Sequence, residues 1–321
     1  MVLAYVTTGI KGVIKSRTYF KNWINATLRI IQIKPSIIFK HLSNPLDIIN
    51  TESCINIYCA NGEKICANPL FYIYIIRGIA YGFIRAIECN ENDNILVING
   101  LRIKLEPKSN HIDFGQAKFK RLHYSLIETF VIQQYALASV ENRVVIDVGA
   151  FIGDTAIYFA LRGAKLVYAI EPHPGAFSEM LWNIKLNHME NRIIPINMAI
   201  ASKKGSIKIS SKVDVDKTFD TYYGPESNSD GDIEIPTITL QQLIEYYNVK
   251  PEILKMDCEG CEYDIILNDY STVKQYFNEL IFEYHKINGY KLKDLLNKLN
   301  NDYKCNITKI GSIGIAHCIR L

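Results

Sequence analysis

The sequence lacks several features that mark particular classes of protein. Its net charge is only +3 over 321 residues, and it contains no run of like charges and no low-complexity tract. No basic, aromatic-interleaved stripe of the kind found in many nucleic-acid-binding domains lies by the candidate site, and only the N-terminal arm could supply such charge, so no nucleic-acid partner is expected. No internal repeat is visible either.

A hydrophobic stretch long enough to cross a membrane is also missing. The longest apolar run, 69–87, is interrupted by Arg77, Arg85 and two glycines. Because a membrane-spanning helix needs about 20 consecutive apolar residues, no transmembrane helix is predicted. Residues 1–12 show no secretory signal, and the eight cysteines are irregularly spaced. These observations favour a reduced, cytoplasmic protein without a disulfide framework.

Acidic residues are missing from the first 46 residues, where basic residues are frequent. Trp23, Leu28 and Phe39 lie among the basic residues, so the segment has a partly amphipathic pattern. Two interpretations are open: a helix in peripheral contact with an anionic membrane, and a helix packed on the main domain with a solvated basic face. The second is favoured, since such helices are far commoner than membrane anchors. The basic residues of this arm are Lys11, Lys15, Arg17, Lys21, Arg29, Lys34 and Lys40.

The sequence does contain a motif typical of nucleotide-cofactor sites. The residues VVIDVGAFIGDT at 144–155 predict a buried strand, a tight turn at Gly149 and Gly153, and a following helix. A second strand, 165–170, ends at Glu171, whose carboxylate can accept two hydrogen bonds from ribose hydroxyls. A strand, a turn and a helix N-terminus in this order hold polar ligands, so a cofactor that contains adenosine is expected.

The glycine and charge pattern favours S-adenosylmethionine over a dinucleotide. Dinucleotide sites use Gly-x-Gly-x-x-Gly for close approach to the pyrophosphate, but this loop has only Gly149 and Gly153. Asp147 would repel a phosphate and attract the ammonium group of an amino-acid cofactor. The predicted cofactor-binding residues are Asp147, Gly149, Ala150, Gly153, Asp154, Thr155, Glu171, Pro172, Asn197 and Ala199.

Strands and helices alternate along the second part of the chain, which predicts an α/β fold with a doubly wound, mainly parallel sheet. Two short strands around Gly311 and Gly314 are expected to close it as a terminal hairpin. The predicted helices cover 175–189, 239–247, 261–267 and 292–299, and the predicted strands cover 192–200, 253–258 and 279–285. The segment 212–232 is long for a connection, and a substrate lid and a plain surface loop are equally open.

The first part of the chain is less regular. Asn99 and Gly100 between alternating apolar residues predict a β-hairpin, whereas 71–87 fits strands or a helix, and 122–137 is typical of a helix. We therefore expect two domains. The first, 1–124, contains the helical arm and the β-hairpin region, and the second is 125–321.

A second informative segment, ILKMDCEGCEYDII at 253–266, places acidic residues after a buried strand. Asp257 ends that strand and Glu259 follows it. A carboxylate at such a place is costly unless it is paired, hydrogen-bonded or used. A later strand carries Glu283 and His285 on one face. Since ligands bind beyond the carboxyl ends of the strands, these four side chains are expected near the substrate.

Six motifs in a fixed order resemble those of a known family. They are VVIDVGAFIGDT, IEPHP, LWNIKLN, TITLQQLI, ILKMDCEGCEYDII and IFEYH. Together they resemble the FkbM-type S-adenosylmethionine-dependent methyltransferases over about residues 125–321. The resemblance implies a Rossmann-like class I methyltransferase with a seven-stranded, mainly parallel sheet whose last strand is antiparallel. It also implies methylation, usually of a hydroxyl on a sugar, glycan or other small metabolite.

The chain departs from this family at Phe151, where Asn is usual, so a polar contact near the cofactor is missing or replaced. A second hypothesis is therefore a catalytically silent S-adenosylmethionine-binding or scaffold protein with the same fold. For an active enzyme, a base must take the proton of the hydroxyl. His285 is the predicted base because of its ordinary pKa, with Asp257 and Glu259 binding or orienting the substrate and Glu283 orienting the imidazole. An alternative is that the carboxylates bind Mg²⁺.

Cys258 and Cys261 form a CxxC pattern with three interpretations. Two small residues filling a tight turn are the simplest. A redox pair is less favoured, because the motif does not lie in the first strand–helix unit. Zinc would need two further ligands, and no residue is assigned as a metal ligand. The candidates for such ligands are His285, Cys305, His317 and Cys318.

Overall fold

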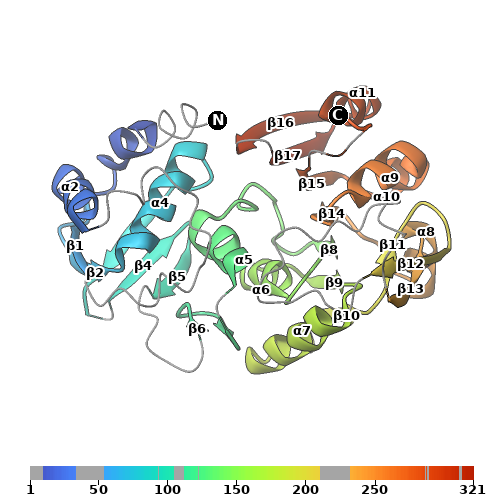
Figure 1. Ribbon diagram of the computed structural model, residues 1–321, viewed down its shortest axis with the longest axis horizontal. Coiled ribbons are helices and arrows are strands. Elements are labelled where there is room, and N and C mark those ends of the chain that lie inside the picture. Colours follow the sequence, from blue (N-terminus) through green and yellow to red (C-terminus); the bar gives the residue numbers. More distant parts are fainter. Residues whose placement is uncertain are drawn as a thin grey trace. The chain divides into compact units, whose positions relative to one another are not determined.

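The computed structural model describes residues 10–33, 54–92, 94–104, 112–121, 123–209, 232–285, 287, 289–310 and 313–321 (Figure 1). The segment 212–232, for which a substrate lid and a surface loop were equally open, lies outside these residues except for Asp232. The chain forms two compact units, 1–137 and 138–321. The two domains expected at 1–124 and 125–321 stay a prediction.

Short antiparallel sheets form the first unit. β1 (Ile55–Tyr58) pairs with β2 (Lys64–Ala67), and β6 (Ile112–Asp113) pairs with β7 (Lys118–Phe119). A third sheet has the order β3 (Ile87–Asn90), β4 (Ile95–Ile98) and β5 (Leu101–Lys104). The hairpin predicted at Asn99 and Gly100 is confirmed between β4 and β5, and both turn residues have positive φ, +47° and +86°.

The helices of the first unit are α2 (Trp23–Ile33), α4 (Pro69–Tyr81), α5 (Tyr124–Leu126) and the π-helix η2 (Ile127–Ile132). The undecided segment at 71–87 is thus helical up to Tyr81. The helix predicted over 122–137 stops early, because Gln133 takes a left-handed conformation with φ +59°. The Gln133 side chain is buried, donates to the Ile98 carbonyl at 3.1 Å and accepts from the Asn99 amide at 2.7 Å.

The basic arm is described over residues 10–33, which contain a helical segment at 10–16 followed by α2. The first of these helices packs closely on α4, because a Cβ on Gly12 would lie 2.8 Å from the Ile76 side chain. Its outer face exposes Ile10 and Ile14 beside basic residues. Peripheral membrane contact through residues 1–46 was the less favoured alternative, and nothing in the described residues tests it. No helix in the described part of the chain is long and apolar enough to span a bilayer.

One seven-stranded sheet organises the second unit, in the order β10-β9-β8-β14-β15-β17-β16 (Figure 1). Its strands are β8 (Val144–Val148), β9 (Leu166–Ile170), β10 (Ile193–Ile196), β14 (Ile253–Met256), β15 (Glu279–Tyr284), β16 (Tyr303–Ile310) and β17 (Ile313–Arg320). The strands from β10 to β15 run parallel, and β17 is antiparallel to both of its neighbours. This confirms the predicted α/β fold with a mainly parallel sheet and an antiparallel last strand.

The central strands of this sheet are buried on both sides. Every residue of β14 and β15 is buried, as expected for parallel strands with helices on both faces. The helices are α6 (Asp154–Leu161), α7 (Pro174–Leu186), α8 (Leu240–Tyr246), α9 (Cys261–Asn268), α10 (Tyr270–Tyr276) and α11 (Leu292–Leu299). Thr239 caps α8 by accepting a hydrogen bond from the Gln242 amide at 3.1 Å.

The single strand predicted over 192–200 is two strands in different sheets. β10 lies at the edge of the main sheet, where Pro195 removes no needed hydrogen-bond donor. After Asn197, β11 (Ala199–Ile200) joins β12 (Gly205–Ile209) and β13 (Ile233–Ile238) in a separate three-stranded sheet. The carboxyl end of β10 therefore lies beside a second sheet that the sequence did not predict.

All eight cysteines are paired, so the prediction that a disulfide framework is missing is wrong. The pairs are Cys54–Cys66, Cys59–Cys89, Cys258–Cys261 and Cys305–Cys318. Irregular spacing hides such pairs because sheet register brings them together; Cys305 and Cys318, for example, lie directly opposite each other in β16 and β17. A cytoplasmic location stays a prediction without this support, since disulfides persist mainly in oxidising compartments.

Candidate functional site

A glycine loop leads from β8 into α6 and passes the carboxyl end of β14. Gly149 has a φ of +75°, and a Cβ on it would overlap the backbone carbonyl oxygen of Asp257. Gly153 has a φ of +83° at the N-cap of α6, and a Cβ there would lie 2.8 Å from Cγ of Met180. Glycine is therefore required at both positions for steric and conformational reasons. The loop lies where cofactors bind in doubly wound sheets.

Glu171 follows β9 and faces the glycine loop. Its carboxylate accepts hydrogen bonds from the backbone amides of Phe151, at 2.9 Å, and His173, at 2.7 Å. Phe151 thus contributes its main chain to the site, and its φ of +46° is unusual for a residue with a side chain. Burial raises the pKa of Glu171 to about 7, although the two amides and the charge of Lys255 oppose the shift.

Asn197 holds the segment that follows β9. Its side-chain amide donates to the carbonyl oxygens of Glu171, at 2.9 Å, and Pro172, at 3.1 Å. Ala150 is fully buried in the glycine loop, and Ala199 begins β11 with 6 % exposure. The structure therefore brings the predicted residues at the ends of β8, β9 and β10 together at one edge of the sheet.

Asp147 lies beneath the glycine loop. Both it and Lys255 are almost completely buried, with 2.9 Å between the Lys255 ammonium and Oδ1 of Asp147. The other oxygen of Asp147 accepts from the Thr155 hydroxyl at 2.6 Å, and Lys255 also donates to the Gly149 carbonyl at 2.8 Å. Asp154, also buried, opens α6. The charge of Asp147 is neutralised inside the protein, so its position does not support the expected attraction of a cofactor ammonium.

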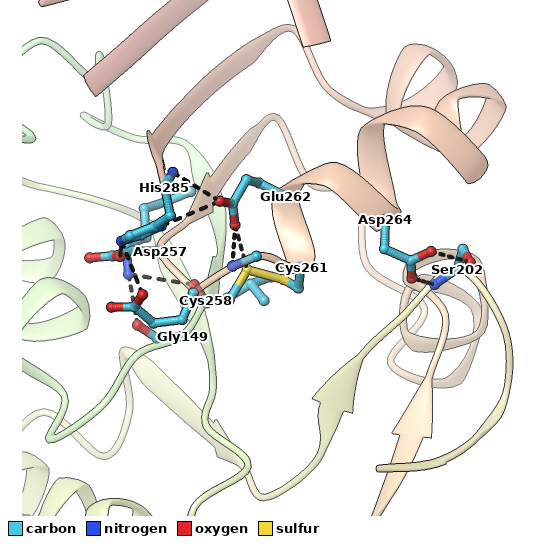
Figure 2. The surroundings of a disulfide bond; sticks show 12 residues. Gly149, Ser202, Asp257, Cys258, Cys261, Glu262, Asp264 and His285 are labelled. Carbon is cyan, nitrogen blue, oxygen red and sulfur yellow. Dashed lines mark hydrogen bonds and ion pairs between the residues drawn. A yellow bond between two sulfur atoms is a disulfide. The ribbon is translucent and has the colours of Figure 1, made fainter. Parts of the chain in front are cut away.

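The carboxyl ends of β14 and β15 and the first turn of α9 carry a second group of polar side chains, which we call the acidic–histidine cluster (Figure 2). It consists of Asp257, Glu259, Glu262, Glu283 and His285. The Nε2 atom of His285 lies 3.3 Å from Glu259 and 3.7 Å from Glu283. Asp257 is 3.9 Å from the same nitrogen. On the other side of the ring, Nδ1 lies 3.3 Å from the fully buried Glu262.

These carboxylates change the expected chemistry of the histidine. Burial by itself lowers the pKa of His285, but the hydrogen bond with Glu262 and the charges of Glu259 and Asp257 outweigh it and raise the pKa to about 10. The ring therefore carries a proton at neutral pH and cannot accept another one. The predicted role of His285 as general base needs a neutral ring, so this geometry favours a hydrogen-bond donor at that position.

Three members of the cluster lie close enough together to be considered as ligands of a divalent metal ion. Asp257, Glu283 and His285 each offer one atom within 4.8 Å of the other two. A protonated imidazole has no free nitrogen lone pair, and a cation would first have to displace that proton. Mg²⁺ also prefers an all-oxygen site. These residues therefore fit Mg²⁺ poorly.

The CxxC pair is a disulfide, so the zinc interpretation is wrong. Zinc needs thiolates, and the further cysteine candidates, Cys305 and Cys318, are bonded to each other. The candidate His317 faces Glu279, with 2.7 Å between Nε2 and the carboxylate.

Two important residues of the site were not predicted. Lys255 stands inside the apolar run ILKM, and a lysine in a buried strand signals a buried partner. Glu262 fits a general preference for acidic residues in the first turn of a helix, which concealed its contact with His285. Asp264 in the same turn accepts hydrogen bonds from the amide and hydroxyl of Ser202, at 2.7 and 2.8 Å (Figure 2).

Comparisons with known proteins agree with this architecture. The family model of the methyltransferase FkbM domain matches residues 147–305. Protein arginine N-methyltransferase 6 of Danio rerio is 40% identical over 77 residues, which cover 24% of this chain and 21% of that protein. A tRNA (guanine(37)-N(1))-methyltransferase, Trm5b, of Methanocaldococcus jannaschii is 46% identical over 55 residues, 17% of this chain and 16% of that protein. The chain thus spans about a fifth of the length of these curated relatives.

Similar solved structures include the methyltransferase FkbM from Methylobacillus flagellatus. It shares 16% sequence identity at a TM-score of 0.41, over 60% of this chain and 53% of that one. M. jannaschii TYW2 in complex with AdoMet shares 18% identity at a TM-score of 0.37, over 68% of this chain and 91% of that one. The family match coincides with the strands and loops that build the site. Through residues 147–305, the chain belongs to the FkbM family of S-adenosylmethionine-dependent methyltransferases.

Proposed function

We propose that this chain transfers the methyl group of S-adenosylmethionine to a hydroxyl of a sugar, glycan or other small metabolite. The contact between the glycine loop and the acidic–histidine cluster supports this proposal most directly. A Cβ on Gly149 would overlap the backbone of Asp257, so the two loops touch without an intervening side chain. A methyl donor held by the first loop would therefore lie beside the polar groups of the second.

Three groups of residues act on the cofactor in this proposal. Glu171 accepts hydrogen bonds from the ribose hydroxyls of S-adenosylmethionine. This cofactor supplies an electrophilic methyl group when it is bound. The loop from Gly149 to Gly153 offers backbone amides and close approach. Lys255 and Asp147 hold this loop from below, because Lys255 donates to the Gly149 carbonyl.

The acceptor side of the proposal uses the more exposed members of the cluster. The side chains of Asp257 and Glu259 are 27% and 32% exposed, whereas Glu262 is fully buried. Asp257 or Glu259 takes the proton from the acceptor hydroxyl as the methyl group is transferred in line. Protonated His285 holds both carboxylates in place and donates to the acceptor oxygen.

The test is a screen of glycan, lipid-linked sugar and small hydroxylated acceptors with labelled S-adenosylmethionine. Removal of a positioned proton acceptor typically lowers turnover about 10²- to 10⁴-fold, so Asp257→Asn should fall in that range. Gln241→Ala, on the exposed side of α8, is a matched control and should keep wild-type turnover. Full activity of Asp257→Asn would remove Asp257 from the mechanism.

A catalytically silent S-adenosylmethionine-binding protein is the second candidate, favoured by the strained Phe151 in the cofactor loop. Cofactor binding measured by calorimetry, followed by turnover on a hydroxylated acceptor, distinguishes the two. A protein that binds S-adenosylmethionine but methylates no acceptor in the screen supports the silent alternative.

The screen of methyl acceptors should also include RNA. Trm5b is a tRNA methyltransferase by name, so the exclusion of nucleic acid stays a prediction. The Mg²⁺ alternative is tested in the same assay, because full turnover in EDTA would contradict it.

A further inference from the structure

The Cys258–Cys261 disulfide lies beside the acidic–histidine cluster, next to Glu262 (Figure 2). Cys258 comes directly after Asp257 at the end of β14, and Cys261 is the first residue of α9. Both cysteines are at least nine-tenths buried, and their Cα atoms are 5.4 Å apart. The bond ties the end of a central strand to the first turn of the next helix.

The two residues enclosed by this bond have unusual backbone conformations. Glu259 has a φ of +53° and Gly260 a φ of +121°. The first value is costly for a residue with a side chain and persists only where the surroundings enforce it. The disulfide encloses Glu259 in a short ring and so supplies such a constraint. The same ring aims the Glu259 carboxylate at His285, 3.3 Å away.

The helix end of the bond carries Glu262, which reaches His285 from the other side of its ring. Glu262 accepts from the Gly260 amide at 2.9 Å and from the His285 amide at 3.3 Å, and it meets His285 Nδ1 at 3.3 Å. The Cys258 sulfur is 3.6 Å from the same carboxylate. The disulfide therefore contacts the buried carboxylate of Glu262, which in turn contacts His285.

Cys258, at the strand end of the disulfide, contacts the glycine loop. A Cβ on Gly149 would lie 3.2 Å from the Cα of Cys258, in addition to its overlap with Asp257. Cys258 therefore lies where the glycine loop meets the acidic–histidine cluster.

We propose that the Cys258–Cys261 disulfide is a positioning bond of the methyl-transfer site, which keeps Glu259 and Glu262 on opposite sides of His285 and makes transfer sensitive to dithiols. This inference rests on the proposed function. In the redox step, a dithiol passes two electrons and two protons to the bond. The dithiol becomes a disulfide, and Cys258 and Cys261 become two thiols. The released ring no longer holds Glu259, and the loop relaxes.

The test compares two double variants with the wild-type protein. Cys258→Ser/Cys261→Ser removes the positioning bond. Cys305→Ser/Cys318→Ser is the matched control, since it removes a disulfide of the same unit beside Leu280, at the opposite end of β15 from His285. Misplacement of reacting groups by about 1 Å can cost 10²-fold, so kcat of the first variant should fall about 10- to 100-fold. The control should keep wild-type kcat.

A second measurement needs no acceptor. NMR of the His285 ring follows its titration among Asp257, Glu259, Glu262 and Glu283, all of which face it. The wild-type pKa of about 10 should fall by at least one unit in Cys258→Ser/Cys261→Ser and stay unchanged in the control. A merely structural disulfide would leave this titration unchanged in a folded variant. Affinity for S-adenosylhomocysteine should stay within about threefold, which shows that the Glu171 side of the site is intact.

Reduction of the wild-type protein with dithiothreitol tests the same bond without any substitution. Wild-type protein should lose turnover as Cys258 and Cys261 become reactive to an alkylating agent, as mapped by mass spectrometry, and regain it on reoxidation. An unchanged His285 titration in the variant, or full turnover after both thiols are alkylated, would overturn the proposal. If the wild-type protein methylates no acceptor, the proposed activity fails, whereas the His285 titration still decides whether the bond positions this ring.

Discussion

The raised pKa of Glu171 predicts that cofactor affinity depends on pH within the neutral range. The buried carboxyl has a pKa of about 7, whereas an ordinary glutamate ionises near 4.5. Ribose hydroxyls donate hydrogen bonds, so they favour the ionised carboxylate over the protonated acid. Binding should therefore be linked to loss of the Glu171 proton, and affinity should weaken as the pH falls through 7.

The size of the effect follows from the fraction of protein that is ready to bind. With a pKa of about 7, roughly 10% of Glu171 is ionised at pH 6 and roughly 90% at pH 8. The apparent Kd should therefore be about tenfold larger at pH 6 than at pH 8. A carboxyl with an ordinary pKa would be ionised at both pH values and would give no such change.

Calorimetric titration with S-adenosylhomocysteine at pH 6, 7 and 8 measures this dependence. Glu171→Gln is the matched control, because its amide does not titrate, so its weaker affinity should vary much less with pH. A wild-type Kd that is constant from pH 6 to pH 8 would refute the reasoning. An equal pH dependence in Glu171→Gln would assign the titration to another group.

Three further perturbations test the supports of the site. Lys255→Met should lower the free energy of unfolding by about 3–5 kcal/mol, because it leaves the Asp147 charge buried alone. The double variant Asp147→Asn/Lys255→Met should regain part of this loss in urea denaturation. Equal stability of the single and double variants would contradict the pairing. Gly149→Ala should weaken S-adenosylhomocysteine binding more than tenfold in calorimetry, since a Cβ overlaps a carbonyl oxygen, and wild-type affinity would disprove the close approach. Cys305→Ser/Cys318→Ser should lower the free energy of unfolding by about 3 kcal/mol in urea denaturation, as expected for a loop of this length, and a loss below about 1 kcal/mol would contradict that estimate.

Local sequence pattern was sufficient to predict the cofactor unit. The apolar run before Gly149 has the period and length of a buried strand, and β8 covers Val144–Val148 as expected. Glu171 follows β9 because the next apolar run ends there. These elements depend on neighbours in the chain, so periodicity and turn residues predict them. The predicted helix over 122–137 failed because a side chain from another element, Asn99, stabilises the left-handed turn at Gln133.

Partners of the charged side chains could not be predicted in the same way. His285 was expected to be neutral because a histidine alone has a pKa near 6.5, and the buried Glu262 that changes this lies on a different element. Asp147 was expected to face a ligand, whereas Lys255 from the neighbouring strand neutralises it. Pairing of Cys305 with Cys318 likewise depends on sheet register. Each of these properties arises from contacts between elements, about which local periodicity contains no information.

The buried pair of Asp147 and Lys255 also bears on how the chain finds its fold. The two residues are direct register partners in β8 and β14, although a long stretch of chain separates these strands. Apart from this pair, both strands are apolar and nearly uniform, so hydrophobic burial alone discriminates poorly between alternative alignments. A slip of one residue would turn Lys255 to the opposite face of the sheet and leave two unpaired charges in the core. The ion pair thus selects one alignment of the central strands against its competitors, at the place where the cofactor loop begins.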